Sequence, residues 1–370
     1  MYKFSAKSNL VLGVLSLLSL LAFLAVEYSK IDVKQDWYQE KLDASLLAKK
    51  AAEDIKNFRL NKGIFIDHIN DPNQTALIGQ EYTKTTTDRG YIDAKLSTTN
   101  PNFAAIIVQL LKDAGLQEGD HIAVAMTGSF PGLNISTIAA LETLKMKPIV
   151  ISSVGSSNWG ANDPYFNWLD MESLLIKDHI FRNKSVAASM GGGADRGRGL
   201  SPEGRRLIEK SVQRNNIPFI NEEYLEKSIN KRMEIYEQKA NGKPIKAFIN
   251  IGGGIASLGN SINGKIIPAG LTPLLPAKNF PVRGVIIQMG RKEIPIIHLL
   301  NINSLLAEYG LPKSPTPLPE PGTGEIFVKK RYSLITTSIA VFILVFIIIL
   351  VYIGETKNHK LGTDIVPLAG

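Results

Sequence analysis

The chain contains no cysteine, which excludes disulfides, iron–sulfur clusters and thiolate zinc sites. Histidine is scarce as well: five residues are scattered along the sequence and form neither an H-E-x-x-H nor an H-x-H pair, so we expect no metal site. Basic runs with interleaved aromatic residues are also missing, and 42 Lys and Arg residues are spread among 34 Asp and Glu residues. This pattern argues against nucleic acid as a partner.

Several functional motifs are absent too. No G-x-x-x-x-G-K-[ST] occurs, and no G-x-G-x-x-G follows the first strand of the predicted sheet, so we expect no nucleotide and no other cofactor. The G-x-S-x-G elbow of many serine hydrolases is missing as well. The formal net charge of +8 favours an anionic partner, either membrane lipid headgroups or an acidic polymer.

Charged residues are missing from two apolar runs, Leu10–Val26 and Leu334–Ile353. At about 1.5 Å per residue, a helix of either run is long enough to cross the hydrocarbon core of a bilayer. The residues Ala25–Ser29 form a poor cleavage site, so we interpret the first run as an uncleaved anchor, with a removed signal peptide as the alternative. The sequence therefore predicts a two-pass protein of the cell membrane.

The orientation of the two crossings depends on the charges beside them. Lys3 and Lys7 in the N-terminal tail, with Lys357 and Lys360 in the C-terminal tail, favour cytoplasmic tails. The cluster Lys329–Arg331 lies on the domain side of the second crossing and argues for the opposite orientation. We expect the large domain to be extracytoplasmic.

Between the two runs, apolar segments of β type alternate with helical segments. The β-type segments carry apolar residues on both faces, as in a parallel sheet that helices cover. They are His121–Met126, Pro148–Ser152, Ser185–Ala188, Ile217–Ile220, Ile245–Asn250, Val285–Met289 and Ile294–Leu299. The clearest helical segments are Asp36–Leu60, Leu133–Lys145, Pro202–Asn215, Glu222–Lys239 and Ile302–Tyr309. The predicted fold is of the α/β class, a mostly parallel sheet with flanking helices, anchored by a transmembrane helix at each end.

Shifts in composition divide the chain into six segments. These are the N-terminal tail and first crossing at 1–30, a juxtamembrane helix and polar Thr-rich region at 31–118, the α/β domain at 119–310, a Pro-rich linker at 311–331, the second crossing at 332–354 and the C-terminal tail at 355–370. Because proline-rich chains are stiff and extended, we expect the linker to act as a spacer beside the membrane.

Four of the predicted strands end in loops of Gly, Ser, Thr and Asn. In a parallel sheet these carboxyl ends share one edge, where ligands bind. Each loop alone could be purely structural, but their common position favours an anion-binding cleft, with backbone N–H groups, hydroxyls and two arginines as donors. The candidate ligand-binding residues are Thr127, Gly128, Ser129, Asn134, Ser157, Asn158, Trp159, Asp163, Gly192, Asp195, Arg196, Arg198 and Gly253.

Candidates for catalysis are fewer. Ser129 lies at a strand-to-helix turn, a place where nucleophilic serines occur, but no motif ties a histidine to it. Asp163 and Asp195 could serve as acid and base. Whether the chain is an enzyme stays open on these residues alone.

Five stretches of sequence together resemble the poly-gamma-glutamate system protein family. They are DPNQTALIG at 71–79, KLSTTNPNFAA at 95–105, GSFPGLN at 128–134, SNWGANDP at 157–164 and LDME at 169–172. The resemblance extends over most of the chain, including both apolar runs, and implies no catalytic residue. It implies a role in making or exporting poly-gamma-glutamate, an anionic amide-linked polymer of the cell surface, as in capsule biosynthesis, with the synthase and export proteins as partners.

Two hypotheses from different classes follow. In the first, the protein is a non-catalytic membrane component that binds the polymer or scaffolds the synthase. In the second, it is an enzyme that hydrolyses or transfers gamma-glutamyl amide bonds. The absence of a recognised catalytic constellation favours the first.

Overall fold

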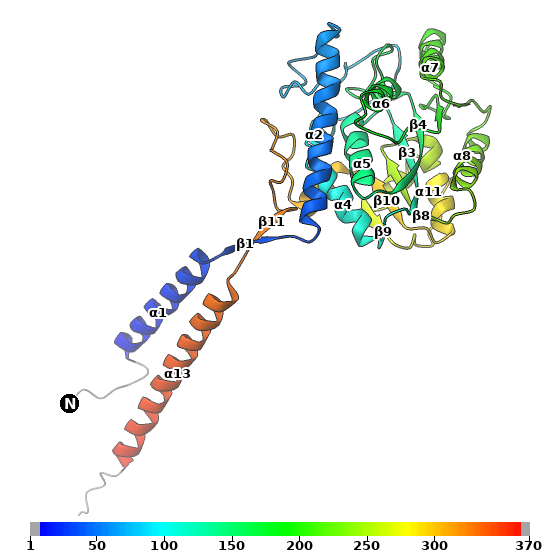
Figure 1. Ribbon diagram of the computed structural model, residues 1–370. Coiled ribbons are helices and arrows are strands. Elements are labelled where there is room, and N and C mark those ends of the chain that lie inside the picture. The colour runs from blue at the N-terminus through cyan, green and yellow to red at the C-terminus, as the bar shows by residue number, and fades with distance from the viewer. Residues whose placement is uncertain (1–7, 364–370) are drawn as a thin grey trace, which may run out of the picture. The chain divides into compact units, whose positions relative to one another are not determined.

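The computed structural model describes the backbone of residues 8–363 and the side chains of residues 8–356. The chain divides into two compact units (Figure 1). One contains the described parts of Met1–Lys34 and Val328–Gly370, and the other contains Gln35–Phe327.

The terminal unit consists of two long helices and a short ribbon. Helices α1 (Asn9–Tyr28) and α13 (Leu334–Thr363) contact each other, and β1 (Ile31–Lys34) pairs antiparallel with β11 (Val328–Arg331). Both helices are long and apolar enough to cross a membrane, with a mean hydropathy of 2.4 for α1 and 3.1 for the part of α13 up to Thr356. The structure therefore has two candidate membrane-spanning helices, at the two predicted positions.

A polar cluster joins the two segments of the terminal unit. Lys30 Nζ forms an ion pair with the Glu27 carboxylate and lies 4.7 Å from the centroid of the Tyr332 ring. The Tyr332 hydroxyl donates a 3.1 Å hydrogen bond to Glu27. Tyrosine and lysine at the ends of apolar helices are typical of a membrane–water interface.

A seven-stranded sheet forms the centre of the larger unit. Its strand order is β7-β6-β4-β3-β8-β10-β9, and neighbouring strands are parallel except for β10 with β9. The strands are β3 (His121–Thr127), β4 (Lys147–Ser153), β6 (Ala187–Ser189), β7 (Phe219–Ile220), β8 (Ile245–Ile251), β9 (Gly270–Thr272) and β10 (Ile296–Leu299). The chain adds strands in one direction from β3 to β7 and in the other from β8 to β10. The order therefore reverses between β3 and β8, which makes this a topological switch point.

Helices cover both faces of the sheet (Figure 1). One layer contains α2 (Tyr38–Asn61), α4 (Phe103–Asp113), α5 (Pro131–Thr143) and α6 (Trp168–Lys177), and the other contains α8 (Leu225–Ala240), α9 (Ile255–Leu258) and α11 (Val285–Arg291). The remaining elements are α3 (Ile92–Thr98), α7 (Pro202–Arg214), α10 (Asn263–Ile266), α12 (Ile302–Tyr309) and a parallel pair of β2 (Thr86–Asp88) with β5 (Ser156–Ser157). The predicted α/β class with a mostly parallel sheet is confirmed.

The central strands are apolar on both faces because both faces are buried. Ala123 and Ala125 of β3 belong to the core on the α8 side, while Val124 between them is also fully buried. The Tyr236 hydroxyl of α8 donates to the Val124 carbonyl at 2.9 Å, so the one polar atom of this large buried side chain is satisfied. This packing gives the ends of β3 and β8 a rigid base.

One predicted strand is wrong. Val285–Met289 forms the buried helix α11. In an apolar run this short, hydrophobic periodicity does not distinguish a strand from a buried helix. The β-branched residues of the run therefore favoured a strand incorrectly. The other six β-type segments overlap observed strands, whereas the antiparallel edge strand β9 was not predicted.

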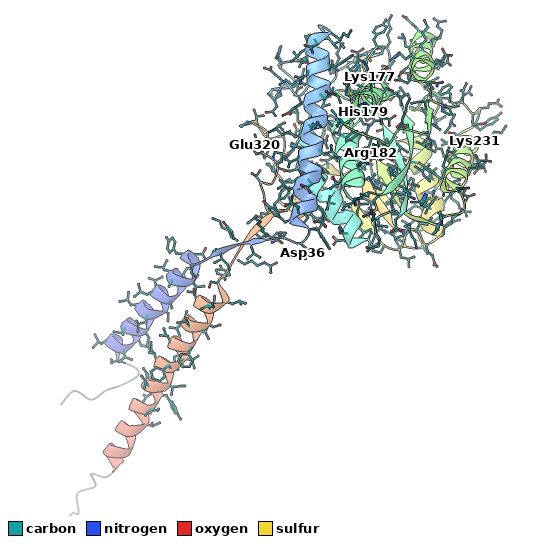
Figure 2. All side chains as sticks on the ribbon, viewed as in Figure 1. Asp36, Lys177, His179, Arg182, Lys231 and Glu320 are labelled. Atoms are coloured by element: carbon teal, nitrogen blue, oxygen red, sulfur yellow. The ribbon has the colours of Figure 1, made fainter. Side chains whose placement is uncertain are left out.

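The predicted boundaries at residues 118 and 310 are also corrected. Residues 35–327 form one unit because α2 packs on α4 and α5, and because polar contacts hold the Pro-rich stretch against the domain. Lys49 Nζ of α2 lies 2.6 Å from the Glu320 carboxylate. Figure 2 shows Glu320 beside α2. The Asn102 side chain donates to the Glu320 carbonyl at 2.9 Å and accepts from the Gly322 N–H at 3.1 Å. The stretch is therefore part of the folded domain rather than a free spacer.

Candidate functional site

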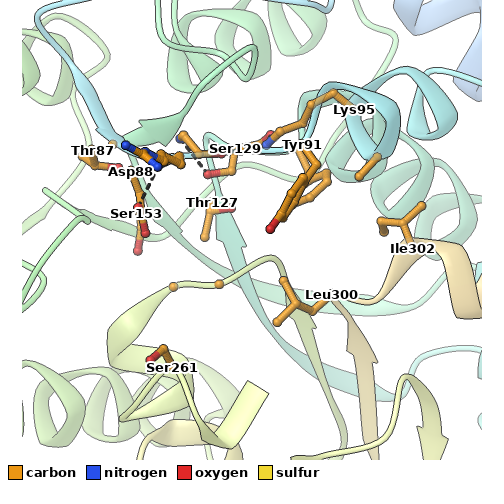
Figure 3. Close-up of a pocket in the computed structure, with 18 of the residues that line it drawn as sticks. Thr87, Asp88, Tyr91, Lys95, Thr127, Ser129, Ser153, Ser261, Leu300 and Ile302 are labelled. Carbon is orange, nitrogen blue, oxygen red and sulfur yellow. Dashed lines mark hydrogen bonds between the residues drawn. The ribbon is translucent and has the colours of Figure 1, made fainter. Parts of the chain in front are cut away.

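A pocket of about 670 Å³ lies at the carboxyl edge of the sheet, beside the switch point (Figure 3). Its volume falls in the range of roughly 300–1,000 Å³ that is common for small-ligand sites. Thr127 ends β3, Ser153 ends β4, and Gly253 follows β8. The other walls come from residues 87–95 and 300–303. The edge predicted from the strand ends therefore does contain a pocket.

Lys95 on α3 is the most unusual residue of the pocket wall. It is 2% exposed, and its Nζ donates hydrogen bonds to the Ser129 carbonyl and, at 2.8 Å, to Ser157 Oγ. Nζ also lies 3.8 Å from the centroid of the Phe130 ring. No carboxylate among the described side chains pairs with it, and burial lowers the pKa of Lys95 from 10.5 to about 7. Near neutral pH this amine therefore exists in both charged and neutral forms.

Two serines meet beside this amine. The Ser157 N–H donates to Ser129 Oγ at 3.0 Å, which connects the loop after β3 to β5. The pairing of β5 with β2 places Ser157 opposite Asp88, so a second strand supports its backbone. Lys95, Ser129 and Ser157 all line the pocket.

Thr127 adds an unpaired hydroxyl to the same pocket. Its side chain is 6% exposed, and its Oγ1 has no hydrogen-bond partner among the described residues. A buried hydroxyl without a partner costs free energy, on the order of 1–3 kcal/mol. The hydroxyl is therefore unsatisfied within the described part of the chain, although the oxygen itself is enclosed by protein atoms.

Apart from Lys95, the charged side chains of the pocket lie at exposed positions. Arg89 is exposed and makes no ion pair with the part of the chain that the structure describes. Asp93 and Lys313 pair with each other at 2.6 Å, so their charges compensate. Asp88 is exposed and accepts a hydrogen bond from the Arg89 N–H. Arg89 is thus the available guanidinium of this pocket.

Five of the candidate ligand-binding residues line the pocket: Thr127, Ser129, Ser157, Gly192 and Gly253. The other eight do not. Arg196 and Arg198 are exposed, and the glycine-rich loop that carries them folds back on itself through bridges of Gly191 with Arg196 and Gly193 with Arg198. The structure therefore does not bring these two arginines to the pocket lining.

Asp195 belongs to a buried network under the pocket. It forms an ion pair with Arg232 at 3.1 Å, and both side chains are 1% exposed. Ser189 and Ser228 donate hydrogen bonds to its carboxylate, and Arg232 also donates to Ser153 Oγ at 3.1 Å. Its oxygens are paired within this network, which holds the glycine-rich loop.

The remaining candidates have structural contacts of their own. Asp163 Oδ1 accepts from the Tyr165 N–H at 2.9 Å, and the Asn134 side chain donates to the Thr127 carbonyl at 2.9 Å. The backbone N–H groups of Asn158 and Trp159 donate to the carbonyls of residues 88 and 80. These residues shape the loops around the pocket without lining it.

Gly128 was a candidate for the close approach of a ligand, and the structure shows it engaged within the fold instead. Its N–H donates to the Ser153 carbonyl at 2.9 Å. A Cβ at this position would lie 2.5 Å from the Val154 carbonyl oxygen. The glycine is needed for close packing of two loops, not for the approach of a ligand.

Sequence reasoning missed Lys95, Arg89 and Tyr91. They lie before the first strand of the sheet, in a segment that was expected to be a polar region outside the α/β domain. The short pairing of β2 with β5 brings this segment to the pocket. Two-residue and three-residue strands leave almost no sequence signal, so the relation was not visible.

The pocket combines hydroxyls, backbone groups, one free guanidinium and one buried amine, and such groups can bind carboxylates and amides. No group of three or more His, Cys, Asp or Glu side chains that could hold a metal ion occurs among the residues the structure describes. Comparisons with known protein families, curated proteins and solved structures find no match to this chain.

We predict opposite outcomes for alanine at two loop glycines. Gly128→Ala should lower the free energy of unfolding by about 1–3 kcal/mol, because its Cβ would overlap backbone. Gly253→Ala should change it by less than about 0.5 kcal/mol, because no atom lies within 4 Å of its Cβ position. Thermal unfolding of the full chain in detergent measures both. Equal stability of the two variants would contradict the structural role of Gly128.

Proposed function

We propose that this protein is a membrane-anchored component of poly-gamma-glutamate synthesis or export, and that the pocket binds the polymer or a glutamate-like anion. The resemblance in sequence supports the pathway, and two long apolar helices at the chain's ends support a two-pass membrane protein. The basic net charge of +8 suits both anionic lipid and an anionic polymer. The synthase and the export proteins are the proposed protein partners.

The observation that carries this proposal is the match between the pocket lining and the repeat of the polymer. Each gamma-linked unit presents a carboxylate, two methylene groups and an amide. Arg89 can pair with a carboxylate, and the hydroxyl of Ser129 can donate to an oxygen. Tyr91 and Leu300 offer apolar surface to the methylene groups (Figure 3).

A second candidate function is the hydrolysis or transfer of gamma-glutamyl amide bonds. The contact between Lys95 Nζ and Ser157 Oγ favours it, because a buried amine beside a serine hydroxyl can act on a bound amide. Binding and catalysis are compatible in one pocket.

We predict that Arg89→Ala weakens binding of gamma-linked glutamate oligomers by about threefold to tenfold, since it removes an exposed charge-assisted contact. The matched control is the double variant Arg196→Ala, Arg198→Ala, which removes two exposed arginines outside the pocket. Calorimetry on the full chain in detergent at low and high salt measures the effect. Binding to the wild type should weaken as salt screens the charges.

Equal losses from Arg89→Ala and from the control would mean that the attraction is diffuse, and would contradict a polymer site in the pocket. No measurable binding to the wild type at low salt would contradict the proposed ligand itself.

We further propose that the larger unit is extracytoplasmic. The lysines of both tails support cytoplasmic tails, although Lys329–Arg331 lies on the other side of the second crossing.

Because the chain has no cysteine, single introduced cysteines report this orientation. We predict that Ile69→Cys, at a position 90% exposed in the larger unit, reacts with a membrane-impermeant maleimide in intact cells. Ser5→Cys in the N-terminal tail should react only after the cells are made permeable. The reverse pattern would place the domain in the cytoplasm.

A further inference from the structure

We propose that Ser157 and Lys95 form a nucleophile–base pair for acyl transfer in the pocket at the switch point. Lys95 Nζ lies 2.8 Å from Ser157 Oγ, and both residues line the pocket. They lie 62 positions apart in the sequence, on α3 and β5. A serine nucleophile and a base within hydrogen-bond distance is the arrangement that activates a hydroxyl.

The pair is held from several sides. Lys95 Nζ also donates to the Ser129 carbonyl and packs against the Phe130 ring. The Ser157 backbone donates to Ser129 Oγ, and β5 pairs with β2. These contacts fix both reacting side chains relative to the same loop.

The charge state of Lys95 suits a base. The other titratable side chains that line the pocket are Asp88, Arg89, Tyr91, Asp93 and Lys313, and none of them forms an ion pair with Lys95 in the described part of the chain. Burial lowers the pKa of Lys95 to about 7, so about half of the molecules carry a neutral amine at pH 7. A neutral amine can take the Ser157 proton.

The reaction can be written in two balanced halves. In the first, Ser157 Oγ attacks the carbonyl carbon of an amide while its proton moves to Lys95 Nζ. The C–N bond then breaks, the leaving amine takes that proton, and an ester on Ser157 remains. In the second, water attacks the ester and gives its proton to Lys95, and the C–O bond to Ser157 breaks as the proton returns to Oγ. A carboxylic acid and an amine are the products; an amine acceptor in place of water would transfer the acyl group.

Ser129 carries the hydroxyl beside Ser157 that can stabilise the oxyanion of each tetrahedral intermediate. Thr127 Oγ1 also has no partner among the described residues, but it is enclosed by protein atoms and contributes only after its side chain rotates. Ser129 Oγ accepts from the Ser157 N–H, and no acceptor for its own proton is found in the described part of the chain. Both residues line the pocket. Hydrogen bonds from such preorganised donors strengthen as the negative charge develops.

Gly90 keeps the space beside the nucleophile open. It lines the pocket, and a Cβ at this position would lie 2.8 Å from Ser157 Oγ. Any larger residue would therefore crowd the hydroxyl from the side of the pocket.

The substrate class rests on the proposed function: an amide that bears carboxylates, with Arg89 as their anchor. The nucleophile–base pair does not depend on it, because the geometry of Ser157 and Lys95 is independent of which acyl group is bound.

The experiment is covalent labelling of the full chain in detergent by a fluorophosphonate probe. A nucleophilic serine forms a P–O bond to this probe as fluoride leaves. We expect mass spectrometry of peptides to find the label on Ser157, at a rate that rises with pH through a midpoint near 7. This mapping uses the wild type, so it does not depend on the folding of any variant.

Variants then assign the roles. Ser157→Ala should abolish labelling, and Lys95→Met should slow it at least a hundredfold with the melting temperature retained or raised. Ser261→Ala, which removes another serine of the pocket lining, should label within about twofold of the wild type. Ser129→Ala should reduce the rate by less than Lys95→Met does.

Absence of label on Ser157, or labelling of Lys95→Met at the wild-type rate, would overturn the proposal. A label on Ser129 instead would also overturn it. Turnover of a gamma-glutamyl anilide by the wild type but not by Ser157→Ala would support both the pair and its substrate class. Labelling of Ser157 without such turnover would support the pair and count against the gamma-glutamyl ligand, so the two proposals fail separately.

Discussion

The burial of the Lys95 amine, without a carboxylate partner among the described side chains, is the constraint on which the site depends. Its pKa falls from 10.5 in an ordinary lysine to about 7 in the folded chain, a difference worth on the order of 5 kcal/mol. The unfolded chain retains the proton up to about pH 10.5, so the penalty is full below pH 7 and fades as pH rises between these two values. Burial of this amine opposes folding at neutral pH, so stability does not explain its presence, and this is the reason for the proposed role of Lys95 in the pocket.

The fold supplies the rigidity that holds this group in place. The ends of β3 and β4 carry Thr127 and Ser153, and the buried pair of Arg232 with Asp195 lies beneath Ser153. The α4–α5 layer and the α8 layer pack both faces of the sheet, so the strand ends cannot shift independently. The segment that carries Lys95 is attached to the loop after β4 through the β2–β5 pairing. It is therefore part of the site although it precedes the sheet in sequence.

The parts that sequence reasoning predicted were those with local signals. Buried β-type runs ending in small polar residues identified Thr127, Ser129 and Ser157 at the edge where the pocket lies. Arg196 and Arg198 looked equally suitable, but neither lines the pocket, whereas Gly192 of the same loop does. Bridges within the loop fix its conformation, and such bridges leave no pattern in the sequence. Lys95 was hidden for a different reason: its environment depends on contacts 34 and 62 positions away. Nothing in residues 92–98 alone distinguishes a buried amine from a solvated one.

The most direct test of this account is the pKa of Lys95 itself. Competitive acetylation of the full chain in detergent, followed by mass spectrometry of each lysine peptide, gives the pH at which each amine becomes reactive. The account predicts a midpoint near 7 for Lys95, with the exposed lysines of the same molecule as the internal reference. A midpoint near 10.5 would show an ordinary, charged lysine, and would contradict both the buried amine and its role as a base.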